Sequence, residues 1–101
     1  MVDVEGELGR TAVKRWVGLL RGVIEGGARG IAVDLRGCRL MDSHCLAAML
    51  AASQTLKSRG GRGVTLVLFP GSRLARHLKL FTAGGELPAY DNAAAAIWAL
   101  S

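Results

Sequence analysis

Four side chains that can react or bind ligands stand next to one another at residues 42–45, in the order Asp, Ser, His and Cys. They follow an apolar run that ends at Met41 and precede an apolar run that begins at Leu46. A strand followed by a helix fits this pattern. The four residues would then occupy a strand-to-helix turn, where they could form a catalytic group, a metal site or a hydroxyl that another protein modifies.

Cys45 is the candidate nucleophile of this turn. A thiol in a first helical turn has its pKa lowered by the helix dipole and by free backbone amides. His44 is adjacent, but successive helical residues point about 100° apart, which is poor geometry for a catalytic base. His77 lies on a different predicted helix. A small cysteine that packs in the core is the favoured interpretation, and a thiol enzyme is the alternative.

Metal and carboxylate chemistry have weaker support. The set Cys38, His44, Cys45 and His77 lacks the usual spacing of zinc ligands. Asp34 and Asp42 are both expected at the C-terminal rim of the sheet, where open α/β sheets place their sites. Asp42, however, has a sufficient role as a helix N-cap, worth about 1 kcal/mol. We therefore predict no catalytic residue, no metal and no cofactor.

Ser43 is the residue best placed for modification. At a first helical position its hydroxyl is expected to be exposed and close to unpaired backbone amides. A phosphate there would add roughly −1.5 to −2 charges where the helix dipole tolerates them. The simpler interpretation is a serine that only begins a helix.

The elements around this turn alternate between strand and helix patterns. Glycine-rich segments at 26–30 and 59–63 each follow a helical pattern, so they end helices and do not form nucleotide-binding loops. Thr11, Asp42 and Asp91 are the expected helix caps. Short strands separated by helices indicate an α/β fold with helices packed on a mainly parallel sheet. The strand patterns cover 2–8, 31–35, 64–69 and 86–90, and the helical patterns cover 11–25, 43–58, 72–81 and 91–100.

Composition narrows the function further. The 101 residues suit one domain, 1–101. The net charge of +5 comes from basic residues scattered between Arg10 and Lys79, which indicates a solvated surface and no direct contact with nucleic acid. No apolar run approaches the roughly 20 residues that cross a bilayer, and the first residues do not resemble a signal peptide. Two cysteines are too few for a disulfide framework. We expect a cytoplasmic protein that does not insert into membranes.

The segment Ile31–Ala52, "IAVDLRGCRLMDSHCLAAMLAA", resembles the core signature of STAS domains, the sulphate-transporter and anti-sigma-factor-antagonist family. Members show a hydrophobic strand ending in Asp-Leu, a short loop with Gly, and then Met/Ile-Asp-Ser-Ser/Thr-Gly-Leu opening a helix. Three further segments are similar to other STAS elements, so the resemblance covers nearly the whole chain: "VEGEL" (4–8), "LVLFPGSRLARHLKLF" (66–81) and "PAYDNAAAAI" (88–97).

The resemblance implies a small non-enzymatic regulator of transcription. Antagonists of this family bind an anti-sigma factor that is also a serine kinase, which phosphorylates the Ser after the Asp of the motif, and a phosphatase reverses this. Carried over by position, the phosphoacceptor is Ser43, and the partner-binding residues are Asp34, Asp42, Ser43, His44 and Cys45. The alternatives are a STAS scaffold without phosphorylation and a partner module of a lipid-transport complex.

Three residues depart from the family pattern: His44 replaces the second hydroxyl, Cys45 the glycine, and Gly9 the Asp after Gly-Glu-Leu. The chain also begins at what matches the second family strand. We therefore expect the first family strand to be absent. Either the chain is a short variant of the family, or a sheet edge is exposed through which copies of the chain could pair.

Overall fold

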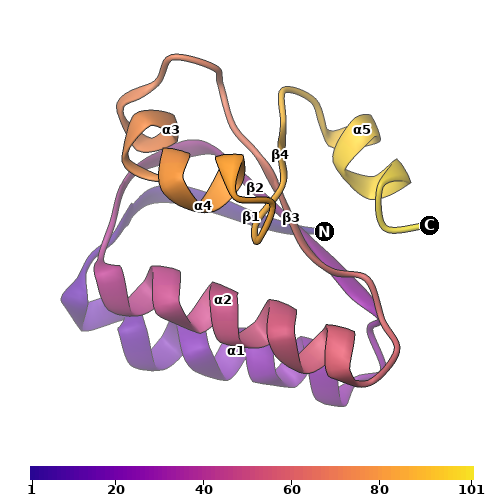
Figure 1. Cartoon of the computed structure of the whole chain (residues 1–101). Coiled ribbons are helices and arrows are strands. Elements are labelled where there is room, and N and C mark those ends of the chain that lie inside the picture. Colours follow the sequence, from indigo (N-terminus) through magenta and orange to yellow (C-terminus); the bar gives the residue numbers. More distant parts are fainter.

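The computed structural model describes all 101 residues and has four strands and five α-helices. Strands and helices alternate, and the third helical segment is divided in two (Figure 1). In chain order the elements are β1 (Val2–Leu8), the 3₁₀ turn η1 (Arg10–Ala12), α1 (Val13–Glu25), β2 (Gly30–Met41), α2 (Ser43–Ser58), β3 (Gly63–Val67), α3 (Arg73–His77), α4 (Lys79–Ala83), β4 (Ala89–Tyr90) and α5 (Ala93–Trp98).

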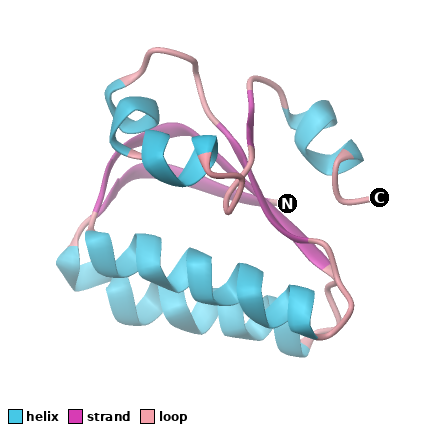
Figure 2. Ribbon diagram, viewed as in Figure 1, coloured by secondary structure: helices cyan, strands magenta, loops and turns pink.

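All neighbouring strands pair in parallel, in the order β1-β2-β3-β4, so β1 and β4 form the two edges. A sheet whose order follows the chain, with right-handed crossovers, carries its successive crossover helices on one face. Figure 2 shows α1 and α2 side by side along the sheet, with α5 apart from them. The predicted α/β fold with a parallel sheet is confirmed.

The main core lies between the sheet and helices α1 to α4. Ile31, Val33 and Leu35 of β2 point into it, and Leu74 and Leu78 close it from the third helical segment. The opposite face of the sheet is covered by α5. Ala32 and Val67 pack there against Ala96, whose carbonyl accepts a hydrogen bond from Thr65 Oγ1 at 3.0 Å. All five residues of β3 are buried, so the predicted cover on both faces is confirmed for this strand. The predicted strand at 64–69 is too long, however, because β3 ends at Val67 and Phe69 is exposed.

The second strand is longer than its apolar pattern predicts. The pattern at 31–35 predicts only the first part of the strand, whereas the predicted strand end at Met41, just before the 42–45 turn, is confirmed. The second half of β2 pairs only with β1, and the last paired residues are Leu8 and Met41. The register between the two strands shifts at two places. Several residues after Leu35 are polar, so the sequence pattern does not reveal this part of the strand. Polar residues are tolerated there because a strand at the margin of a sheet needs few apolar contacts.

Two predicted caps are wrong. Thr11 lies inside η1 and caps nothing, since the chain enters α1 through a 3₁₀ turn. Asn92, not Asp91, caps α5, and its Oδ1 accepts the Ala95 N–H at 2.8 Å. Neither difference changes the fold, because each moves a helix start by only one or two residues.

The C-terminal third also differs in detail. The predicted helix at 72–81 is interrupted at the buried Leu78, whose backbone (φ −90°, ψ 4°) leaves helical values, giving α3 and α4. The predicted strand at 86–90 is reduced to the two residues of β4, which pair with Leu66 and Val67 of β3.

Candidate functional site

Ser43 is the first residue of α2 and is exposed. Asp42 precedes it as the N-cap, and Asp42 Oδ1 accepts the backbone N–H of His44 at 2.8 Å. The Ser43 hydroxyl itself makes no hydrogen bond with any other group of the protein. The predicted cap at Asp42 and the predicted exposure of Ser43 are therefore both confirmed.

The end of β1 fixes the backbone just before Ser43. The Asp42 N–H donates to the Leu8 carbonyl at 2.7 Å, which continues the pairing of β1 with β2 by one more bond. Gly9 and Arg10 follow Leu8 directly, so the first crossover begins beside the site. Sequence reasoning did not include Arg10 in the site, because only strand pairing brings residue 10 close to residue 42.

The charges around Asp42 favour its ionised form. Hydrogen bonds from the His44 backbone N–H and, next in strength, from the His44 imidazole hold the pKa of Asp42 below its usual value. The positive charge of Arg10 acts in the same direction but less strongly. The His44 Nδ1 lies 2.9 Å from Asp42 Oδ1, and the ring is about two-thirds exposed (67%). Asp42 and His44 thus turn toward each other across the first turn of α2.

Cys45 is fully buried in the core. Its backbone carbonyl accepts a hydrogen bond from Trp16 Nε1 at 3.1 Å, which ties α1 to the first turn of α2. Burial, and secondarily the charge of Asp42, raises the pKa of the Cys45 thiol above its usual value. Burial therefore outweighs the effect of the helix start, and the predicted packing role of Cys45 is confirmed. A buried thiol with a raised pKa is the opposite of what a nucleophile needs.

The potential zinc ligands are not assembled. No group of three or more His, Cys, Asp or Glu side chains is arranged to hold a metal ion. Cys38 is buried, and burial also raises the pKa of its thiol.

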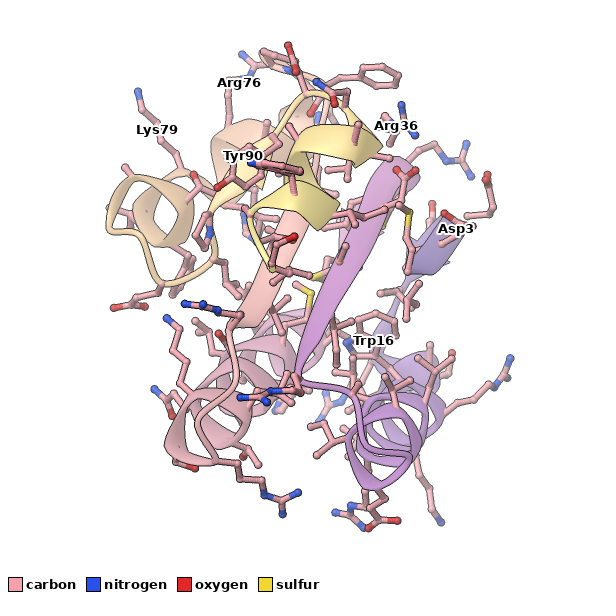
Figure 3. The ribbon with its side chains drawn as sticks, turned by 90° about the vertical axis from the view of Figure 1, so that its right-hand side faces the viewer. Asp3, Trp16, Arg36, Arg76, Lys79 and Tyr90 are labelled. Carbon is pink, nitrogen blue, oxygen red and sulfur yellow. The ribbon has the colours of Figure 1, made fainter.

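Asp34 does not lie at the same rim as Asp42, contrary to our expectation. It pairs with Val67, the last residue of β3, but about 23 Å of β2 separates it from Met41 at ~3.3 Å per residue. Its carboxylate binds Arg36 instead, with Oδ2 at 2.6 Å from Nη2. Figure 3 shows Arg36 on the side of the sheet that carries Asp3, far from Trp16. The two carboxylates separate because β2 runs on beyond β3.

A similar fold occurs in a solved protein. The structure of the anti-sigma factor antagonist SpoIIAA in its unphosphorylated form matches this chain with a TM-score of 0.69, over 92% of this chain and 79% of SpoIIAA. The chain has the STAS fold. The STAS resemblance of the sequence is thus confirmed for the fold, which the two proteins share at 20% sequence identity. The sequence matches no family model and no curated protein.

None of the helices of this STAS fold combines the length and the apolar character that crossing a bilayer requires.

Proposed function

We propose that this STAS-fold protein is an anti-sigma factor antagonist-like regulator, which binds an anti-sigma factor with serine kinase activity and is switched by phosphorylation of Ser43. One observation carries the proposal: Ser43 is exposed and unbonded at the first position of α2, in a fold that also occurs in the anti-sigma factor antagonist SpoIIAA. In this function the protein is a cytoplasmic binding partner and not an enzyme.

The position of Ser43 suits a switch that leaves the fold intact. Phosphorylation adds roughly −1.5 to −2 charges at the start of a 16-residue helix, where the dipole and free amides favour an anion. Arg10 adds a positive charge nearby, while the ionised Asp42 opposes the phosphate. The modified surface would therefore change sharply in charge without a large loss of stability.

The surface that the partner reads would centre on Asp42, Ser43 and His44. Cys45 is buried, so its part would be to shape the first turn of α2. Asp34 remains a proposed contact, although its ion pair with Arg36 and its distance along β2 place it at the margin of such a surface.

Phosphorylation by the anti-sigma factor kinase of the host organism tests the proposal. We expect one phosphate per chain in wild type and none in Ser43→Ala. Ser58→Ala is the matched control, because Ser58 is the exposed serine at the other end of α2. We also expect Ser43→Glu to weaken the complex with the kinase at least tenfold. Equal phosphorylation of wild type and Ser43→Ala would show that the proposed site is wrong.

A STAS scaffold without phosphorylation, for example in a lipid-transport complex, is the second candidate. It is favoured by the His44 ring, which lies against Asp42 and beside Ser43, where a kinase would approach. In that case Ser43→Glu would leave partner binding unchanged. The double variant His44→Ser, Cys45→Gly would then separate the two candidates. Phosphorylation of the double variant but not of wild type would show that the first turn of α2 prevents phosphorylation of Ser43.

Pairing of two copies through the free edge of β1 also remains a proposal. β1 carries Asp3, Glu5 and Glu7, so antiparallel pairing of two copies would bring like charges together. A mass measurement by light scattering at low and high salt tests it, and dimers that form only at high salt would support it.

A further inference from the structure

An apolar groove of about 600 Å³ runs between α1 and α2 on the side that faces solvent. Val13, Val17 and Ile24 line one bank, and Ala47, Ala48 and Ala51 line the other. Figure 1 shows the two helices side by side along most of their length. The Trp16–Cys45 hydrogen bond joins their N-terminal turns, so the helices run in the same direction. The buried core residues Leu20 and Ala52 also line this α1–α2 groove, so its floor is continuous with the main core while its banks face solvent.

The solvent-facing surface of α2 is unusual for a surface helix. It carries no Asp, Glu, Lys or Arg between Ser43 and Leu56, and its exposed positions include Ala47 and Ala51. α1 has the ordinary arrangement, with charged side chains such as Lys14 and Arg15 on its exposed face. Alanine on an exposed helical bank lets the backbone of a second helix approach closely, as ridge-into-groove packing requires.

Unpaired positive charge stands at one end of the groove. Arg21 and Arg59 line it there, and neither guanidinium makes an ion pair or a hydrogen bond with another group of the protein. Glu25 is the one acidic residue among the lining side chains, so this end keeps a net positive charge. His44 lines the opposite end, next to Ser43.

We propose that the α1–α2 groove docks an amphipathic helix of a partner protein, with apolar side chains at i, i+3 or i+4, and i+7 in the groove and acidic side chains facing Arg21 and Arg59. The 13 residues of α1 span about 20 Å, which offers a partner helix three to four turns of contact. An acyl chain fits less well, because small-molecule sites bury most of their ligand and Ala47 and Ala51 leave this groove open. The proposal does not depend on phosphorylation of Ser43.

A peptide titration tests the proposal without any kinase. The probe is a 16-residue helical peptide with a leucine stripe and two terminal Glu residues, and the matched peptide has Lys at the same two positions. In ¹⁵N-labelled protein, we expect saturable amide shifts confined to α1 and α2, and tighter binding of the Glu peptide.

Variants of the protein then locate the contact. Ala51→Glu should weaken binding of the Glu peptide at least tenfold. Gln54 is exposed on the same helix but outside the groove, so Gln54→Glu should change the affinity less than twofold. Arg21→Glu with Arg59→Glu should reverse the preference toward the Lys peptide. Thermal melts confirm that each variant is folded.

The proposal is overturned if neither peptide binds, if the shifts lie elsewhere, or if Ala51→Glu and Gln54→Glu act alike. Tighter binding of laurate than of the peptides at the same residues would also overturn it and would make the groove a lipid site. These outcomes are independent of whether Ser43 is a phosphoacceptor.

Discussion

Asp42 and His44 are joined twice across the first turn of α2. Asp42 Oδ1 accepts the His44 backbone N–H at 2.8 Å and lies 2.9 Å from His44 Nδ1. Neither contact involves Ser43, which lies between the two residues in the chain. The Ser43 hydroxyl makes no hydrogen bond with another group of the protein. The four residues that first suggested a reactive group therefore divide into a capping pair, a free serine and the buried Cys45.

The cap can be tested by substitution of Asp42. We expect Asp42→Ala to lower the free energy of unfolding by about 1 kcal/mol, because the His44 N–H loses its acceptor. For a domain of this size this corresponds to a fall in Tm of about 4–8 °C. Asp42→Asn is the control, because asparagine caps about as well as aspartate. Equal Tm values for Asp42→Ala and Asp42→Asn would contradict the capping role.

The two tryptophans should respond differently to replacement by Phe. Trp16→Phe removes the hydrogen bond to the Cys45 carbonyl inside the core, which should cost about 1–3 kcal/mol. Trp98→Phe should change stability by less than about 0.5 kcal/mol, because Trp98 is 80% exposed. Urea unfolding of both variants measures the difference. Similar midpoints would mean that the link between α1 and α2 does not stabilise the fold.

Thiol labelling checks the structural role of the cysteines. Cys38 and Cys45 are buried and reduced, and burial raises the pKa of both thiols. A maleimide at pH 7 should therefore label neither residue in the native protein and both in guanidinium chloride. Rapid labelling of Cys45 in the native state would revive the thiol-enzyme alternative.

Acid should lower the free energy of unfolding, in part because Asp34 becomes protonated. The Arg36 guanidinium, as a hydrogen-bond donor, holds the pKa of Asp34 below its usual value. A carboxylate with a lowered folded-state pKa contributes stability that is present above its unfolded pKa of about 3.9 and is lost as the pH falls toward the folded value. Asp34→Asn should therefore make the loss of stability between pH 5 and pH 3 shallower, as measured by urea unfolding.

The control for this acid effect is Glu25→Gln, which removes an exposed carboxylate that has no ion pair. Because Glu25 forms no ion pair, Glu25→Gln should change the dependence of the unfolding free energy on pH less than Asp34→Asn does. Because Asp42 also has a lowered pKa, part of the slope should persist in Asp34→Asn. An identical slope in wild type and Asp34→Asn would contradict the stabilising role of the Asp34–Arg36 pair.

Features that depend on near neighbours in the chain could be predicted from the residue pattern alone. Alternating strand and helix patterns led to the α/β fold, and the apolar β3 segment marked a strand covered on both faces. The run Asp42–Ser43 before an apolar stretch identified the start of α2, because a cap and its helix lie within three residues. These signals are local, so no knowledge of the remaining chain was needed.

The surroundings of Ser43, in contrast, depend on contacts between distant segments of the chain. The extension of β2 to Met41 requires β1 as a partner, and it separates Asp34 from Asp42. The same pairing brings Arg10 near Asp42, while packing of α1 against α2 buries Cys45 and forms the α1–α2 groove. Each of these relationships joins segments far apart in the chain. Such contacts depend on strand register and helix packing, which residue patterns within one segment do not encode.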